Sequence, residues 1–474
     1  MIRNERQYRI TKAQVEDFER KIHALDAQPE APGIHPRIRQ AQRDAIRSQV
    51  DELREDLVAY EALQAGRAKV LELSSLDELP SALIQARIAA GLTQRQLADR
   101  LGMKEQQLQR YEATEYAGAN LERIREVVSA LGIKVREDVF LPSADVSQKR
   151  VVRRATGAGL SKEFVANRIM PKVPSDDSSA ALGAASLLNR IFGWAPAALF
   201  GDAPLAMSGA ALAGARFKLP ATSATRATEA YAAYAYYVAG LLLRATPSLA
   251  PTAIPTDASA FRDAVLARGK FTLATTLDYV WSLGIPVLPL SDTGAFHGAT
   301  WRIGGRNVIV LKQGTRFESR WLHDLLHEVR HAAEEPDAEE LAFIDYDALA
   351  KSNGAATAET TASFFAGNVQ LAGRAEELAE ACVAATSGSI ERLKSVVPQV
   401  AEQAGVSTAA LANYMAFRLA LQGANWWGAA TNLQSGESDP WQVARDRAVA
   451  HLDLTNLDDT ERGVLLRALE GDAS

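Results

Sequence analysis

Residues 307–331 read NVIVLKQGTRFESRWLHDLLHEVRH, and this stretch carries the clearest structural pattern in the 474-residue chain. Its first five residues form a short apolar run that predicts a buried β-strand. From Trp321 onward, apolar residues recur at three- and four-residue steps, as they do along one face of an amphipathic helix. We therefore expect a strand followed by a helix that packs on the edge of a small sheet.

The predicted helix ends in the pentapeptide HEVRH, which has the form HExxH. Residues four apart lie on one face of a helix, so the imidazoles of His327 and His331 can bind one tetrahedral zinc ion. Glu328 would then lie beside the open coordination position, where it could take a proton from water. The pentapeptide thus predicts Zn²⁺ as cofactor and Glu328 as catalytic base, although two surface histidines on an amphipathic helix would give the same letters.

A third protein ligand must come from elsewhere in the fold. Glu359 opens a second helical pattern, and a carboxylate is a normal third ligand of zinc. Asp345 and Asp347 are alternatives. Glu339 and Glu340 are also alternatives, but they belong to an acidic run typical of a solvated face.

Two further histidines are candidates for a supporting role. His323 lies one turn before His327 and could stabilise a developing oxyanion, hydrogen-bond a ligand or fill space. His297 lies in a glycine-flanked turn before a possible strand and could line the cleft.

Residues 217–370 resemble the ImmA/IrrE family of bacterial zinc metallopeptidases. The shared features are a strand, an HExxH helix, an acidic loop and a helix beginning with Glu359, in that order. The resemblance implies a zincin-like α+β domain with His327, His331 and Glu359 as ligands and Glu328 as base. Arg330 stands where the family commonly has glycine and could narrow the cleft or contact an acidic substrate group.

A second signature lies upstream, in four consecutive helical patterns. A helix from residue 79 ends near Gly91, and Thr93 and Gln96 then form a capping box for the next helix. Patterns over residues 104–113 and 121–131 follow. Two short helices joined by a tight glycine turn are typical of a helix-turn-helix, although a four-helix module used for protein contacts would look similar.

This segment resembles the Xre/Cro class of repressors, which implies double-stranded DNA as a partner. Gln94 would contact a phosphate, and the remaining candidates for bases or backbone are Lys104, Gln106, Gln107 and Arg110. Basic residues in the segment are almost matched by acids, so non-specific attraction to DNA should be modest.

Composition indicates a regulator with several parts. The formal net charge is −6, and Cys382 is the single cysteine, which excludes an intramolecular disulfide. No charged-then-apolar leader precedes the first helix, so we expect a cytoplasmic location. The longest apolar run, residues 230–243, is shorter than the ~20 residues needed to cross a bilayer, so no membrane association is expected.

Two apolar stripes near the start predict an antiparallel helical hairpin. One runs from Val15 to Leu25 and the other from Ile46 to Tyr60, with residues 29–36 between them. Such a stripe can be intramolecular core, but it can also form a contact between chains. We expect a homodimer, because paired recognition helices read two half-sites.

These patterns predict a mainly α-helical protein with a small β-sheet. The expected parts are a helical hairpin, a helix-turn-helix domain, a linker with helical segments, an ImmA/IrrE-like metallopeptidase domain and a C-terminal helical region, over residues 1–75, 76–140, 141–215, 216–390 and 391–474.

We hypothesise a DNA-binding transcriptional regulator whose zinc peptidase cleaves itself, a partner repressor or a toxin and so relieves repression. The alternative is an antitoxin or repressor with a structural or sensory metal site. A scaffold that binds neither metal nor DNA would require both motifs to be accidental.

Overall fold

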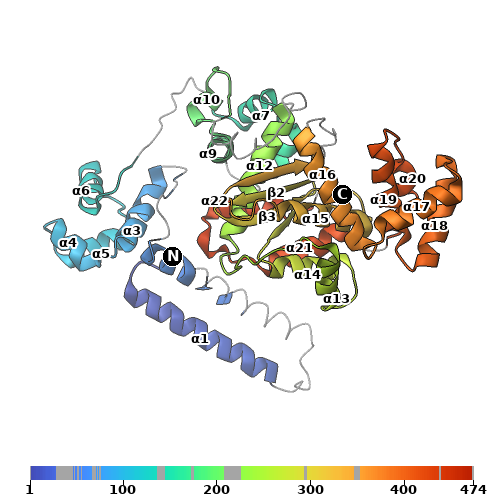
Figure 1. Cartoon of the computed structure of the whole chain (residues 1–474). Coiled ribbons are helices and arrows are strands. Elements are labelled where there is room, and N and C mark those ends of the chain that lie inside the picture. The colour runs from blue at the N-terminus through green and yellow to red at the C-terminus, as the bar shows by residue number, and fades with distance from the viewer. Residues whose placement is uncertain are drawn as a thin grey trace, which may run out of the picture. The chain divides into compact units, whose positions relative to one another are not determined.

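The computed structural model divides the chain into two compact units, residues 1–143 and 144–474. Figure 1 labels the helices and strands of both units. The structure describes residues 2–27, 56–66, 76–135, 145–171, 176–207, 226–292, 296–345, 353–436 and 439–471, with isolated positions between 46 and 73. The predicted class, mainly helical with a small sheet, is confirmed. The predicted five-part division stays a prediction.

The first unit begins with the predicted antiparallel hairpin. Helix α1 (Glu5–Ala27) lies against helical residues 56–64. The rings of Tyr8 and Tyr60 stack with centroids 5.2 Å apart, and Arg54 contacts Glu19 at 2.5 Å, so the two segments run in opposite directions. Val15 and Tyr60 are buried within the chain, as intramolecular core would be. The predicted connection at 29–36 lies outside the described residues, and the homodimer stays a prediction.

Four helices after the hairpin follow the predicted pattern. They are α3 (Leu79–Ala89), α4 (Gln94–Arg100), α5 (Glu105–Ala113) and α6 (Leu121–Leu131), with the short 3₁₀ helix η1 (Leu76–Glu78) before them. Thr93 caps α4 in a capping box with Gln96, as expected. Gly91 and Gly102 have φ of 66° and 64°, a left-handed conformation that favours glycine at these turns.

The second unit begins with helices that precede the sheet. They are α7 (Gln148–Gly157), α8 (Lys162–Phe164), the π-helix η2 (Val165–Ile169), α9 (Asp177–Phe192), α10 (Pro196–Phe200) and α12 (Arg226–Arg244). Much of the region predicted as a linker with helical segments is therefore helical. Ala-rich α9 buries its alanines and leucines and packs against both α7 and α12.

A four-stranded mixed sheet lies at the centre of this unit, in the order β1-β3-β2-β4. The strands are β1 (Val287–Pro289), β2 (Gly298–Ile303), β3 (Arg306–Leu311) and β4 (Leu341–Asp345). Strands β1 and β3 are parallel, and β2 is antiparallel to β3 and β4. Gly304 and Gly305 both have positive φ, which suits the two-residue turn between β2 and β3.

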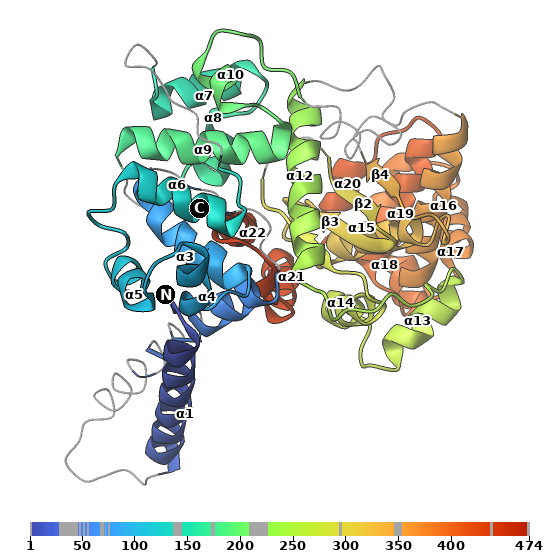
Figure 2. The ribbon, with the colours of Figure 1, turned by 90° about the vertical axis from the view of Figure 1, so that its left-hand side faces the viewer.

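Helices cover both faces of the sheet (Figure 2). Helix α12 packs on one face, where Tyr236 contacts Trp301 of β2. Helix α15 (Glu318–Ala332) packs on the other, where Thr300 donates to Glu328. Because successive side chains of a strand point to opposite faces, β2 contributes alternate residues to the two layers. The predicted strand at 307–311 and the helix through 321–331 are confirmed as β3 and α15.

The remaining helices surround this core. Helices α13 (Ala258–Leu266), α14 (Leu273–Ser282) and α16 (Asn353–Gln370) adjoin α15 or one another. A cluster of buried apolar side chains joins α17 (Ala375–Thr386), α18 (Leu393–Ala404), α19 (Thr408–Leu421) and α20 (Trp427–Thr431), with the 3₁₀ helix η3 (Ile390–Arg392) before α18. The last elements are α21 (Pro440–Ala450), η4 (Leu454–Asn456) and α22 (Asp459–Ala468), and these two α-helices return to the sheet region, α21 against β1 and α22 against α12. In the described part of the chain, no helix combines the length and apolarity needed to cross a bilayer.

Candidate functional site

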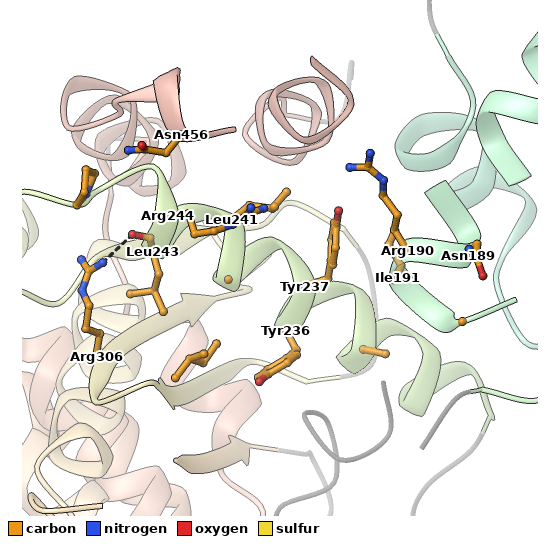
Figure 3. A pocket seen from close by; sticks show the side chains of 15 residues that line it. Asn189, Arg190, Ile191, Tyr236, Tyr237, Leu241, Leu243, Arg244, Arg306 and Asn456 are labelled. Atoms are coloured by element: carbon orange, nitrogen blue, oxygen red, sulfur yellow. Dashed lines mark hydrogen bonds between the residues drawn. The ribbon is translucent and has the colours of Figure 1, made fainter. Parts of the chain in front are cut away.

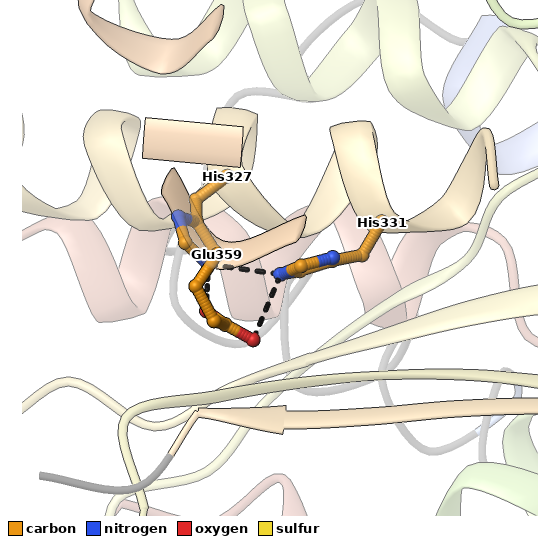
Figure 4. Close-up of side chains that lie close together, drawn as sticks. All are labelled: His327, His331 and Glu359. Carbon is orange, nitrogen blue, oxygen red and sulfur yellow. Dashed lines mark hydrogen bonds and ion pairs between the residues drawn. The ribbon is translucent and has the colours of Figure 1, made fainter. Parts of the chain in front are cut away.

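Helices α15 and α16 bring His327, His331 and Glu359 together, as the sequence predicted (Figure 4). The Nε2 atoms of the two histidines are 3.0 Å apart. One carboxylate oxygen of Glu359 is 3.0 Å from Nε2 of His327, and the other is 3.5 Å from Nε2 of His331. Three donor atoms from two separate helices thus converge within 4.8 Å of one another.

This donor set fits a single divalent cation. Tetrahedral zinc, with ligands about 2.0–2.1 Å away, requires neighbouring donors about 3.3 Å apart, close to the observed separations. Two imidazoles and a carboxylate are common zinc ligands, and they suit other first-row divalent metals as well. The arrangement therefore identifies a candidate metal centre and leaves the metal itself open.

The alternative third ligands are not found beside the two histidines. Glu339 and Glu340 are exposed, and Glu340 accepts a hydrogen bond from the Gly304 amide at the turn between β2 and β3. The side chain of Asp345 and all of Asp347 lie outside the described residues. Of the acidic groups that the structure describes, Glu359 is the one in the cluster.

Two residues that sequence reasoning missed hold the ligands in place. Ser363 lies one turn after Glu359 on α16, and its hydroxyl is 3.1 Å from Nδ1 of His327. The ring of His331 stacks on Phe343 of β4, with centroids 4.3 Å apart and planes 14° from parallel. The four-residue spacing of Glu359 and Ser363 could have indicated the first contact, because such residues share a helix face. Nothing in the sequence indicates the second.

Glu328 points toward the sheet and is almost completely buried, with 1% of its surface exposed. The Thr300 hydroxyl donates to its carboxylate at 2.7 Å. Gly298, on the same face of β2, leaves room for that carboxylate, since a Cβ there would be 2.3 Å from Glu328 Oε1. The sequence predicted Glu328 as a base but not Thr300 and Gly298 as its neighbours.

The carboxyl end of α15 is attached to the sheet by Arg302. Its buried guanidinium donates to the carbonyl oxygens of Ala332 and Glu334 at 2.8 and 3.0 Å. Asn307 adds a bond to the Ala332 carbonyl at 3.1 Å. The last carbonyls of a helix lack partners within the helix and carry partial negative charge, so a buried cation stabilises this end. His331, in the last turn, is thereby held over the sheet.

The protonation states of the ligands suit a cation. Burial by itself would raise the pKa of Glu359, but hydrogen bonds with His327 and His331 outweigh it and lower that pKa. Burial also lowers the pKa of His331. An ionised carboxylate and a neutral imidazole are the forms that bind metal, so the charge states of Glu359 and His331 suit a cation.

His323 and His297 lie outside the cluster of three donors. Burial lowers the pKa of His323 to about 3, and its Nδ1 faces the side-chain amide of Gln370 at 3.4 Å. The ring is therefore neutral at physiological pH. His297 is half-buried directly before β2. Oxyanion stabilisation by His323 and cleft lining by His297 stay predictions.

Arg330, where the sequence departs from the pattern that it resembles, is paired with a residue just beyond the end of α15. Its guanidinium contacts Glu334 at 2.7 Å, one turn later. An acidic group of a substrate would therefore have to compete with Glu334 for Arg330.

The helix-turn-helix presents most of its predicted DNA-binding residues to solvent. Lys104, Gln106 and Gln107 are exposed at the start of α5, and Arg110 is exposed in its last turn. Gln94 is half-buried, and its side-chain amide donates to Glu112 at 2.8 Å. Contacts of all five with DNA stay predictions.

A buried ion pair that the sequence analysis missed joins α3 to α5. Arg87 donates to both carboxylate oxygens of Glu112, at 2.5 and 2.8 Å, and both side chains are almost fully buried. This pair fixes α5 against α3 from inside the module. Two charged residues 25 positions apart gave no pattern from which the pairing could be predicted.

Comparison with known proteins identifies one part of the chain. Residues 83–137 match the helix-turn-helix family model, and this match supports a DNA-binding regulator of the Xre type. It does not extend to residues 217–370, for which the ImmA/IrrE-like peptidase domain stays a prediction. No curated protein and no solved structure matches the chain.

Proposed function

We propose that this chain is a DNA-binding regulator whose second unit is a zinc-dependent peptidase. The observation that carries the proposal is the convergence of His327, His331 and Glu359, with Glu328 directly after His327 on the same helix. The substrate would be the chain itself or a partner protein such as a repressor or toxin. Cleavage would relieve repression.

The residues of the chain divide the chemistry among them. His327, His331 and Glu359 would hold the zinc ion, which would supply Lewis-acid polarisation of a peptide carbonyl. Glu328 would take a proton from the attacking water and pass it to the leaving amine. Thr300 supports this role by holding the Glu328 carboxylate at 2.7 Å.

A second candidate is a regulator whose metal site is structural or sensory, without proteolysis. The burial of Glu328 favours it, since a general base must reach a water molecule and this carboxylate lies between Thr300 and Gly298. In that case metal would tie α15 to α16 and change DNA affinity through the stability of the unit.

Glu328→Gln separates the two candidates. The purified full-length chain is loaded with zinc, its metal content is measured by atomic spectroscopy, and cleavage of the chain and of co-purifying proteins is followed by mass spectrometry. If the chain is a peptidase, the Glu328→Gln variant should have full zinc content and should cleave nothing. Glu334→Gln is the matched control, because Glu334 is on the same stretch but is paired with Arg330. Wild-type protein that binds zinc and cleaves nothing would favour the second candidate.

DNA binding is tested separately, by selecting bound sequences from a random duplex pool with the full chain. Gln107→Ala and Arg110→Ala should each weaken binding to the selected site by about 1–3 kcal/mol, as loss of a base contact does. Arg123→Ala is the control, since Arg123 lies on α6 and pairs with Glu126. Equal effects of all three changes would contradict recognition through α5.

A further inference from the structure

A pocket of about 760 Å³ lies on the α12 side of the sheet (Figure 3). This volume is within the range of ~300–1,000 Å³ typical of small-molecule sites. Trp301 and Ile303 of β2 face this layer, whereas Thr300 faces α15 and the metal centre. The pocket and the metal centre therefore lie on opposite faces of one strand.

The wall formed by α12 is a regular helical stripe. Its members recur at three- and four-residue steps, and they are Ala233, Tyr236, Tyr237, Gly240, Leu241 and Arg244. The stripe combines aromatic rings with small residues, so it offers both an apolar surface and open space. Gly240 provides that space, because a Cβ placed there would meet no atom within 4 Å. Ile191 of α9 and Ile303 of β2 add apolar surface on other sides.

The charged residues among the described lining residues are all arginines: Arg190, Arg244 and Arg306. Two of them are neutralised by carboxylates at the start of α22. Arg190 contacts Asp458 at 2.8 Å, and Arg244 contacts Glu461 at 2.5 Å. These two carboxylates also form the capping box of α22, so they are committed to holding that helix.

Arg306 differs from the other two arginines. Its two terminal nitrogens each donate at 2.7 Å to a backbone carbonyl, one to that of Leu243 in the last turn of α12 and the other to that of Thr246 just after the helix. No carboxylate of the described residues lies within ion-pair distance of it, and its buried Nε has no hydrogen-bond partner there. Among the described residues that line the pocket, Arg306 is thus a cation whose hydrogen-bond partners are backbone carbonyls and not carboxylates. A single negative charge is what this environment lacks.

We propose that this pocket binds a small amphipathic monoanion, a carboxylate with an aromatic or branched aliphatic body. The apolar body would pack against the stripe on α12 and against Ile303, and the carboxylate would lie near Arg306. A molecule of higher charge is disfavoured because the other two guanidiniums are already paired. Such a ligand would act as an effector of the regulator, at a site separate from the metal centre.

The test uses the full-length chain and defined probes. 8-Anilinonaphthalene-1-sulfonate, an aromatic monoanion, serves as the fluorescent reporter, and 1-naphthaleneacetate competes with it. The neutral 1-naphthaleneacetamide has the same body without the charge. We expect one-site binding of the reporter and its displacement by the acetate. The amide should displace the reporter about ten-fold or more less effectively, because it cannot form the charge-assisted hydrogen bond that the acetate forms.

Two pairs of variants locate the site. Gly240→Phe should fill the pocket and abolish reporter binding, whereas Gly240→Ala should retain it, and both keep a helical backbone. Arg306→Gln keeps a side-chain donor for the backbone carbonyls at the end of α12. It should weaken the binding of 1-naphthaleneacetate but not the binding of 1-naphthaleneacetamide. The proposal is overturned if Gly240→Phe binds the reporter as wild type does. It is equally overturned if the acetate and the amide compete alike, or if neither probe binds at millimolar concentration.

Discussion

Adding one methyl group at Gly298 should displace the Glu328 carboxylate without touching the metal ligands. In Gly298→Ala the new Cβ would lie 2.3 Å from Oε1, 2.9 Å from Cδ and 3.0 Å from Cγ of Glu328. Carbon atoms in ordinary contact with their neighbours are about 3.5–4.0 Å away, so the carboxylate must retreat by about 1 Å or more. Its 2.7 Å bond from Thr300 would then be lost.

The free-energy cost follows from these two effects. Loss of a hydrogen bond to a charged group costs about 1.5–3 kcal/mol, and overpacking a well-filled site costs about 1–3 kcal/mol. Replacing glycine by alanine lowers the entropy of the unfolded chain, which offsets about 0.4–1 kcal/mol. We therefore expect a net loss of about 2–4 kcal/mol, or a melting temperature lower by about 3–6 °C for a unit of this size.

A double-mutant cycle measures whether the contact causes the loss. Gly298→Ala, Glu328→Ala and the double variant are compared as metal-free proteins by thermal unfolding, because bound metal would add its own stability. The double variant should be nearly as stable as Glu328→Ala alone, since the new methyl group fills space that the carboxylate has left. Gly183→Ala on α9, where a Cβ meets nothing within 4 Å, is the control and should not be destabilising. Additive effects, or full stability of Gly298→Ala, would refute the packing of Glu328 on β2.

Three further measurements test other parts of the structure. His323 stays neutral in the folded protein down to a pKa of about 3, whereas the unfolded chain protonates it near pH 6.5. The free energy of unfolding should therefore fall as the pH drops below about 6.5, by about 1.4 kcal/mol per pH unit from this residue, and urea unfolding of His323→Gln should have a shallower pH slope. Glu112→Gln leaves Arg87 buried without a carboxylate, so the first unit should lose about 3–5 kcal/mol in urea unfolding, and a smaller loss would indicate that water reaches the pair. Burial raises the pKa of Cys382 to about 11, so its labelling by a thiol reagent near neutral pH should occur only as the second unit opens, and rapid labelling of the native chain would contradict its burial.

Much of the fold was predictable because it rests on local pattern. Thr93 and Gln96 form their capping box within one turn of chain, and Gly91 and Gly102 end helices through backbone conformations that favour glycine. The strand at 307–311 and the helix after it also follow from apolar spacing. These features depend on residues that are neighbours along the sequence, so the local sequence is sufficient to predict them.

The candidate metal centre was only partly predictable. HExxH places His327 and His331 on one helix face, because the helical repeat alone determines that geometry. The carboxylate from 359, the hydroxyl of Ser363 and the ring of Phe343 come from other elements. Glu359 was predicted as third ligand, and its four-residue spacing from Ser363 places both on one face of α16, but the distances of these groups from the two histidines depend on how α16 and β4 pack.

The chain's sequence by itself determined the helix-turn-helix, the HExxH helix and the helical class of the protein, since each is set by periodicity, capping or turn chemistry over a few residues. Tertiary structure alone decided that Glu328 is buried against Gly298 and Thr300 and that Arg87 meets Glu112. It also decided that Arg306 lines a pocket where no carboxylate of the described residues is within ion-pair distance of it. Each of these contacts joins residues from different elements. Local propensity does not determine such pairings. They are determined when the layers of the fold pack and exclude water, because packing decides which side chains become neighbours of each buried charge.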